Sequence, residues 1–544
     1  MNPFTIISDL ETCYKYGKAL VDFCQRWKDA DAELAERVTT VELCWITTTA
    51  QMQLITTLHP VLKDEVRRIL DSGLAVLARK LDLAVVQVKK LQDPLSDARP
   101  GFLHFRRRAK GAKYAVYQST LNATIRDLED WQGRCKTALD LNMRDPNPVI
   151  DEKLKTMREE KQAGGGAATR GHTSTTAASP LSLTGGIRDA LQPSGTQPSV
   201  FLPTMPLSTS PIPFSRAKAA CMPSSSQPAR WFILDTLPCR PQTDVHALND
   251  DVRELARKLK RADPFAFGLL NCKGVMRVFG QAPNMDLEGF DLVFNVPEGT
   301  DPRQMKSLRR LLLSGREGGG PLSLSRRVRL AQELATSVSY VHTFNFVHKN
   351  IRPESVLLFD GDTGSAQLGG SSVVATNRRS SFLIGFESFR SAGRGTSFMG
   401  DQDWEHNIYR HPERMGEFPA EAYRMQHDIY SLGVCLLEIG MWEPLVAYTG
   451  DDADASPGYG RVCRDFVETG QPWVCFKDHL VGLAQNELPR RMGDRYADVV
   501  VTCLTCLDRD GSFGNQPEVS DADGILVGVR FIETIFGQLN EIVL

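Results

Sequence analysis

Residues 346–358 have the sequence Phe-Val-His-Lys-Asn-Ile-Arg-Pro-Glu-Ser-Val-Leu-Leu, in which a polar centre lies between two apolar ends. Before this stretch, apolar residues recur every three or four positions from Val328 to Val341, which predicts a long amphipathic helix that ends at about His342. After it, residues 428–440 are apolar almost all round, which is typical of a helix inside a domain. These patterns place the polar stretch within a folded, largely helical region.

The region before this one mixes strands and a helix. Residues 230–234 predict a strand, and residues 244–261 predict a helix with Val252 and Leu255 on its apolar face. Residues 275–279 and 290–296 predict two more strands. The fold class expected for this part of the chain is therefore α+β.

This order of elements resembles that of a eukaryotic protein kinase. We identify residues 229–540 as similar to that family, which implies two lobes, an N-lobe at about 229–298 and a C-lobe at about 299–540. The matching stretches are 292–298 for the last N-lobe strand and hinge, 340–342 for the helix before the catalytic loop, 348–358 for that loop and the next strand, 411–413 for the end of the activation segment, and Asp428 with Gly433 for the buried helix. The resemblance gives Glu413 and Asp428 structural roles and makes Asn295 a hinge residue for nucleotide binding.

The positions that carry catalysis in kinases are changed. The family pattern His-Arg-Asp-Leu-x-x-x-Asn keeps His348, but Asn350 replaces the catalytic Asp and Ser355 replaces the metal-binding Asn, while Arg352 takes the place of a Lys. Gly385 stands where the resemblance implies the magnesium-binding Asp. The strand at 230–235 has no lysine to hold phosphates. Residues 221–228, which precede Trp231, do not contain a glycine-rich loop. No catalytic position is intact. The sequence therefore predicts no cofactor, unless nucleotide binding is retained, in which case ATP with Mg²⁺ is expected.

These changes predict a signalling pseudokinase, in which the kinase-like domain is a switch or scaffold. One alternative is an atypical active serine/threonine kinase that binds ATP and Mg²⁺, with Glu354, Asp360 or Asp362 as substitute acids. Another is a membrane-acting cell-death effector that works through the N-terminal region.

Residues 1–150 predict an all-α bundle of at least four helices. Apolar residues have helical spacing in blocks that lie at 7–27, 34–55, 66–91 and 114–139. His59-Pro60 ends the second block, because the residue before proline is pushed out of the helical region. A basic cluster of Arg106, Arg107, Arg108, Lys110 and Lys113 lies at the start of the fourth helix. It is either a solvated loop or a patch for acidic lipid headgroups or a partner.

Residues 163–228 are rich in Gly, Ser, Thr, Pro and Ala, which predicts a disordered linker. A helical bundle ahead of a degenerate kinase-like domain, with Val21-Asp22-Phe23-Cys24-Gln25-Arg26-Trp27-Lys28-Asp29-Ala30 and Glu36-Arg37-Val38 in the bundle, resembles fungal proteins with an N-terminal HeLo-like domain. That resemblance implies a fungal signalling protein of the incompatibility or cell-death type.

The charge balance, the N-terminal residues and the cysteines limit the partners and the cellular location that we expect. The 64 basic and 66 acidic residues nearly cancel, so we expect no nucleic-acid partner, although protein partners and oligomers through the bundle are expected. The N-terminus lacks a secretory pattern, and the 12 cysteines are scattered, which favours a reducing, cytoplasmic location. Cys503 and Cys506 form one CxxC without a second pair, so we expect them to be core residues and not zinc ligands.

Overall fold

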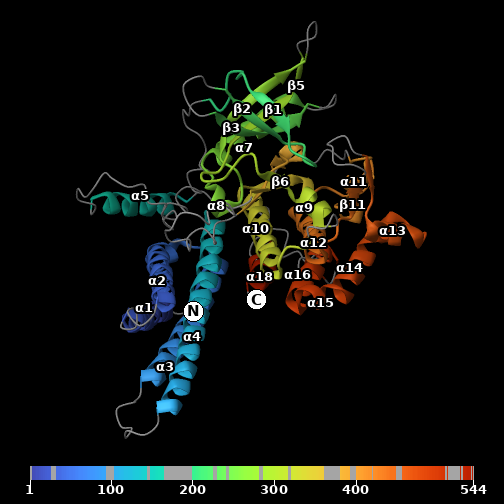
Figure 1. Ribbon diagram of the computed structural model, residues 1–544. Coiled ribbons are helices and arrows are strands. Elements are labelled where there is room, and N and C mark those ends of the chain that lie inside the picture. The colour runs from blue at the N-terminus through green and yellow to red at the C-terminus, as the bar shows by residue number, and fades with distance from the viewer. Residues whose placement is uncertain are drawn as a thin grey trace. The chain divides into compact units, whose positions relative to one another are not determined.

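The computed structural model describes residues 3–25, 32–92, 103–143, 147–163, 199–223, 229–239, 244–280, 286–315, 320–359, 380–391, 400–419, 421–448, 456–508, 511, 527, 531–540 and 542. The chain forms two compact units, Met1–Arg188 and Asp189–Leu544. The first is helical and the second contains sheets, as the sequence predicts (Figure 1).

The first unit is built from long helices. They are α1 (Pro3–Gln25), α2 (Ala32–Leu58), α3 (Asp64–Gln92), α4 (Leu103–Asn142) and α5 (Pro148–Ala163), with the short turn η1 (His59–Val61) after α2. Helices α1 to α4 pack pairwise through the predicted apolar faces, which bury Val38, Leu74 and Leu128. The bundle prediction is confirmed, and His59-Pro60 ends α2 as expected. The basic cluster from Arg106 to Lys113 falls within α4, but its side chains lie outside the described part of the chain.

The second unit begins with a five-stranded antiparallel sheet in the order β1-β2-β3-β5-β4 (Figure 1). The strands in the described part of the unit are β1 (Ser208–Pro211), β2 (Lys218–Met222), β3 (Arg230–Pro238), β4 (Cys272–Phe279), β5 (Leu287–Asn295), β6 (Met305–Ser307), β7 (Phe346–Val347), β8 (Val356–Phe359), β9 (Ser381–Leu383), β10 (Arg390–Ser391), β11 (Val446–Tyr448) and β12 (Pro457–Tyr459). Helix α7 (Val245–Lys260) packs against β4. The predicted strands and helix of this region are confirmed.

The linker prediction for 163–228 is wrong where the structure describes it, at 199–223. Strands β1 and β2 belong to the sheet, and Leu202, Met205 and Leu207 pack against its core. Residues 199–202 also lie parallel to β4, where the Leu202 N–H donates to Val275 O (2.8 Å) and the Val275 N–H donates to Val200 O (2.9 Å). The sheet therefore starts before residue 229. The prediction failed because the many Pro and Ser residues dominate the composition, although apolar residues of the sheet lie between them. Residues 164–198 lie outside the described ranges.

The remainder of the second unit is mainly helical. Its helices are α8 (Pro264–Phe267), α9 (Leu308–Ser314), α10 (Leu324–Thr343), α11 (Trp404–Asn407), α12 (Met425–Met441), α13 (Arg461–Glu468), α14 (Phe476–Asn486), α15 (Leu488–Met492), α16 (Asp494–Leu504) and α18 (Gly537–Asn540), with the short turns η3 (Pro353–Ser355), η5 (Phe386–Ser388), η6 (Pro412–Arg414), η7 (Trp473–Cys475) and η9 (Ile532–Phe536). Every residue of α12 is buried, as predicted. Gly433 lets α12 approach α16, because a Cβ there would lie 2.6 Å from the Cβ of Cys503. Cys503 and Cys506 are both buried, which confirms the prediction that they are core residues.

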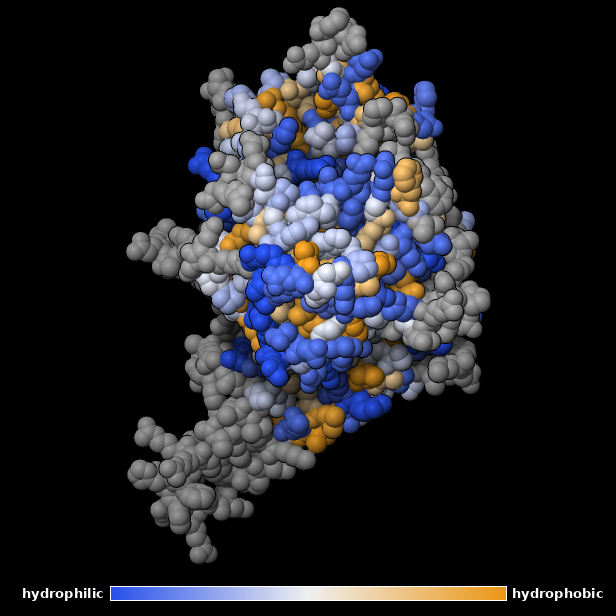
Figure 2. Space-filling model, turned by 90° about the vertical axis from the view of Figure 1, so that its right-hand side faces the viewer, coloured by the Kyte–Doolittle hydropathy of each residue, from blue (hydrophilic) through white to orange (hydrophobic). Residues whose placement is uncertain are grey.

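The described surface shows no single apolar face in the view of Figure 2, where hydrophobic residues are scattered among hydrophilic ones. Among the described helices, none is both long and apolar enough to cross a bilayer.

Two helix-interior glycines of the bundle make a matched pair for a stability test. A Cβ at Gly17 of α1 would overlap the Trp45 indole of α2, whereas a Cβ at Gly73 of α3 would meet Trp131 only at 3.7 Å. Gly17→Ala should destabilise the helical unit by about 1–3 kcal/mol through overpacking. Gly73→Ala should stabilise it by roughly 0.5–1 kcal/mol through helix propensity. Thermal unfolding of the two variants measures this, and shifts of the same sign would contradict the packing of α1 on α2.

Candidate functional site

The loop at 348–355 is fixed by one buried carboxylate from α12. Asp428 Oδ2 accepts a hydrogen bond from the His348 N–H (2.8 Å), and its Oδ1 accepts one from the Lys349 N–H (2.9 Å). The Tyr423 hydroxyl donates to Oδ1 (2.7 Å), and His342 Nε2 lies 3.1 Å from Oδ2. Burial alone would raise the pKa of Asp428, but the hydrogen bond and charge of His342 outweigh burial and lower it. Asp428 is therefore an ionised anchor for the loop backbone.

His348 is a core residue of this loop. Its imidazole is buried against Phe386, with ring centroids 4.9 Å apart, and its Nδ1 accepts a hydrogen bond from the Asn350 N–H (3.3 Å). Burial lowers the pKa of His348 to about 4, so the ring is neutral near pH 7.

Asn350 uses both ends of its amide inside the loop. Its Nδ2 donates to Gly385 O (3.1 Å), and its Oδ1 accepts from Arg352 Nε (2.7 Å). An aspartate here could not donate to Gly385 O, so the amide suits this arrangement better than the carboxylate of an active kinase.

Ser355 also turns inward. Its hydroxyl donates to Arg352 O (2.8 Å) and accepts from the Arg352 N–H (3.2 Å), which closes turn η3. The hydroxyl is buried and serves the turn. It stands where the resemblance implies a metal ligand.

Position 385 favours glycine for two reasons. Its φ is +85°, a left-handed conformation that favours glycine, and a Cβ would lie 2.8 Å from Ser355 Cβ and 3.1 Å from Asn350 Nδ2. The metal-binding Asp of a kinase does not fit at this position without rearrangement of the loop.

Asp235 of β3 contacts the same turn, and the sequence analysis did not single it out. Its Oδ2 accepts hydrogen bonds from the Gly385 N–H (2.9 Å) and the Phe386 N–H (2.8 Å). Burial raises the pKa of Asp235 to about 7 against the opposing effect of these two amides, and the nearby Glu387 raises it further. The available signal was an acidic residue directly after the apolar run at 231–234, but the partner Gly385 lies 150 residues away in the sequence.

The connection between β1 and β2 closes over this region. Arg216 Nη1 pairs with Glu387 Oε2 (2.7 Å), and Arg352 Nη2 approaches Glu387 Oε1 (3.5 Å). The ring of Phe214 lies 4.8 Å from that of Tyr448, and Pro213 O accepts a hydrogen bond from the Ser307 hydroxyl (2.8 Å). The connection between β1 and β2 is therefore held in place by an ion pair, a hydrogen bond and aromatic packing.

Glu354 is committed to a buried ion-pair network. It binds Arg309 Nε (2.7 Å), whose Nη1 also binds Glu438 (2.9 Å) and whose Nη2 binds the Tyr409 hydroxyl. Arg309 is fully buried, so its removal would leave two uncompensated carboxylates. Glu354 thus has a structural role. Asp360 and Asp362, the other proposed substitute acids, lie outside the described residues.

Asn295 and Glu413 complete the predicted positions. The Asn295 amide donates to Asn271 Oδ1 (2.7 Å) at the end of β5, so it ties this strand to the turn before β4. Glu413 lies in η6, 3.7 Å from His427 Nε2 and 3.9 Å from Arg424 Nη2. The structure brings His348, Asn350, Arg352, Ser355, Gly385 and Asp428 together in one cluster, whereas Asn295 and Glu413 have their partners elsewhere.

Comparison with known proteins finds similarity to protein kinases. A probable LRR receptor-like serine/threonine-protein kinase of Arabidopsis thaliana is 29% identical over 140 residues, which cover 25% of this chain and 14% of that protein. A mitogen-activated protein kinase kinase of Aspergillus fumigatus is 23% identical over 193 residues, 35% of this chain and 31% of that protein. The chain thus spans less than a third of either relative. No family model matches the chain. These findings indicate a protein-kinase-like region.

The contact of Gly385 with Ser355 can be measured against a second left-handed glycine. Gly416 has a φ of +79°, but nothing lies within 4 Å of its Cβ position. Gly416→Ala should cost about 1–2 kcal/mol of unfolding free energy from backbone strain. Gly385→Ala should cost that and roughly 1–3 kcal/mol more from the close contacts. Thermal unfolding of both variants tests this, and equal losses would contradict the described contact.

The buried carboxylate of Asp235 predicts a pH dependence of stability. A raised folded-state pKa favours the protonated form, so this group's stabilising contribution is full below the unfolded pKa of about 3.9. It is lost as pH rises to about 7, by up to roughly 4 kcal/mol. In Asp235→Asn, the side-chain oxygen still accepts from both amides without a buried charge.

The melting temperature of Asp235→Asn relative to wild type should therefore rise between pH 5 and pH 8. Asp244→Asn, which keeps a good N-cap of α7, supplies the baseline for an exposed replacement of the same kind. A difference in melting temperature between Asp235→Asn and wild type that is the same at every pH would contradict a buried carboxylate whose protonation is coupled to folding.

Proposed function

We propose that the second unit is a two-lobed kinase-like domain without phosphotransfer activity, and that the protein is a signalling pseudokinase. The sheet order β1-β2-β3-β5-β4, the helix α7 against β4 and the loop anchored to the buried α12 support this proposal. The similarity to two protein kinases supports it as well.

The observation that carries the proposal is the contact between Asp235 and the Gly385–Phe386 turn. Phosphoryl transfer depends on metal ions and cationic groups that neutralise the phosphates. Here β3 contributes a carboxylate instead of a lysine, and the turn that should offer a metal ligand offers two backbone amides to that carboxylate. Both features oppose the binding of Mg²⁺-ATP in a reactive geometry.

The side chains around the loop support the same conclusion. Asn350 and Ser355 are both used in local hydrogen bonds, and the β1–β2 connection is held by the Arg216–Glu387 ion pair. Because these groups stabilise one another, the site is suited to hold a fixed conformation that a partner recognises or displaces.

In this proposal the helical first unit is the interaction or effector part, and the kinase-like domain is a switch or scaffold that controls it. A protein partner is the expected ligand. The HeLo-like and fungal assignments, the cytoplasmic location, self-association through the bundle and membrane binding through Arg106 to Lys113 stay predictions.

The test is nucleotide binding and phosphotransfer with the full chain. We expect that ATP, with or without Mg²⁺, leaves the melting temperature unchanged, because the phosphate-neutralising groups are replaced. We also expect no transfer of labelled phosphate to the protein or to a generic substrate.

One combination of results would overturn this proposal. A magnesium-dependent rise in melting temperature, together with transfer that Asn350→Ala abolishes, would overturn the proposal in favour of an atypical active kinase. Asn350 is the informative position because it stands at the place of the catalytic base.

A further inference from the structure

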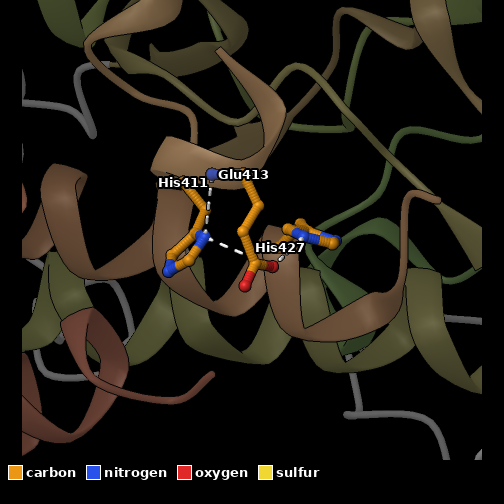
Figure 3. A group of neighbouring side chains, drawn as sticks. All are labelled: His411, Glu413 and His427. Atoms are coloured by element: carbon orange, nitrogen blue, oxygen red, sulfur yellow. Dashed lines mark hydrogen bonds and ion pairs between the residues drawn. The ribbon is translucent and has the colours of Figure 1, made fainter. Parts of the chain in front are cut away.

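Three potential ligand side chains converge away from the loop described above. His411 directly precedes turn η6, and Glu413 lies within this turn. His427 comes from the first turn of α12 (Figure 3). His411 Nδ1 lies 3.6 Å from Glu413 Oε2, and His427 Nε2 lies 3.7 Å from the same oxygen. One donor atom from each residue lies within 4.8 Å of the other two.

The separations within this cluster are too long for hydrogen bonds, which require about 2.7–3.2 Å. They are close to the spacing of two ligands on one zinc ion, because bonds of about 2.0–2.1 Å at a tetrahedral angle place ligand atoms roughly 3.4 Å apart. The three donors therefore surround a space of the size that a small cation needs.

Two of the three donor atoms are buried without a hydrogen-bond partner. His427 is 1% exposed and His411 is 5% exposed. Among the described residues, His427 Nε2 and Glu413 Oε2 make no hydrogen bond, and both face the cluster (Figure 3). Buried polar atoms normally find a partner, so these two indicate a missing ligand.

We propose that His411 Nδ1, Glu413 Oε2 and His427 Nε2 bind one Zn²⁺ ion, with water as a fourth ligand. Two imidazoles and one carboxylate are a donor set that suits zinc better than Mg²⁺ or Ca²⁺, which prefer oxygen ligands. The ion links turn η6 to the first turn of α12, the helix that also carries Asp428. This inference does not depend on whether the domain transfers phosphate.

Metal binding exchanges two existing contacts. His411 Nδ1 accepts a long hydrogen bond from the Glu413 N–H (3.3 Å), and His427 Nδ1 accepts one from the Arg424 N–H (2.8 Å). When Nε2 of His427 binds the ion, its proton moves to Nδ1, and the Arg424 N–H loses its acceptor. The affinity is consequently lower than that of a preformed structural zinc site.

A neighbouring cluster provides a matched control. Asp401, Asp403 and His406 also have donor atoms close together. There, however, His406 Nδ1 lies 2.8 Å from Asp401 Oδ2, and Arg410 Nη2 lies 3.2 Å from the same oxygen. These groups satisfy one another, so we expect no ion at this second cluster.

The experiment uses the full chain after removal of metals with a chelator and under reducing conditions. Titration with Zn²⁺ is followed by calorimetry, and titration with Co²⁺ by its visible absorption. Wild type should bind one ion per chain with the spectrum of nitrogen and oxygen ligands, and Zn²⁺ should raise the melting temperature. His427→Gln and Glu413→Gln should each weaken binding at least tenfold, whereas His406→Gln should leave it unchanged.

Three results would overturn the proposal. They are no saturable Co²⁺ binding by wild type, loss of binding in His406→Gln, and a thiolate-to-cobalt charge-transfer band, which would assign the ion to cysteines. If His427→Gln melts earlier or loses helical signal before metal is added, Glu413→Gln decides the outcome. Its side chain is 38% exposed, and the substitution preserves its shape.

Discussion

The buried carboxylate of Asp428 is the interaction on which the arrangement of the second unit depends. It comes from a helix without an exposed residue and accepts the backbone N–H groups of two consecutive loop residues. An ionised group in such a place is costly unless it is fully hydrogen-bonded, and four donors or neighbouring groups meet that requirement here. The position of His348, and of every loop residue after it, follows from this one anchor.

Around that anchor, the changed residues form one hydrogen-bonded unit. Asn350 binds Gly385, Gly385 leaves room for Ser355 and Asn350, and the Gly385 amide binds Asp235. The mutual fit of these four residues indicates a conformation with its own structural requirements, so a substitution at one of them would disturb the others.

The periodic parts of the fold could be predicted from the sequence, whereas contacts between distant residues could not. Helices α2, α3 and α12 follow directly from the spacing or density of apolar residues, and the order of motifs placed Asp428 next to the loop. Strands β1 and β2 were missed because a composition rich in Pro and Ser outweighed the few apolar residues that fill the sheet. Asp235 and Arg309 were missed because a charged residue is explained only by its partners, which are separated from it by up to about 150 positions.

The strand-like segment at 199–202 covers the edge of the five-stranded sheet at β4. It is joined to β4 by the backbone bonds at Val275, and Phe201 lies against the guanidinium groups of Arg277 on β4 and Arg253 on α7. Without these contacts the edge of β4 would be exposed, while Arg253 would keep its ion pair with Asp250 (3.0 Å). An exposed strand edge offers unpaired backbone groups to another chain, so this segment also guards the sheet against pairing with a second molecule.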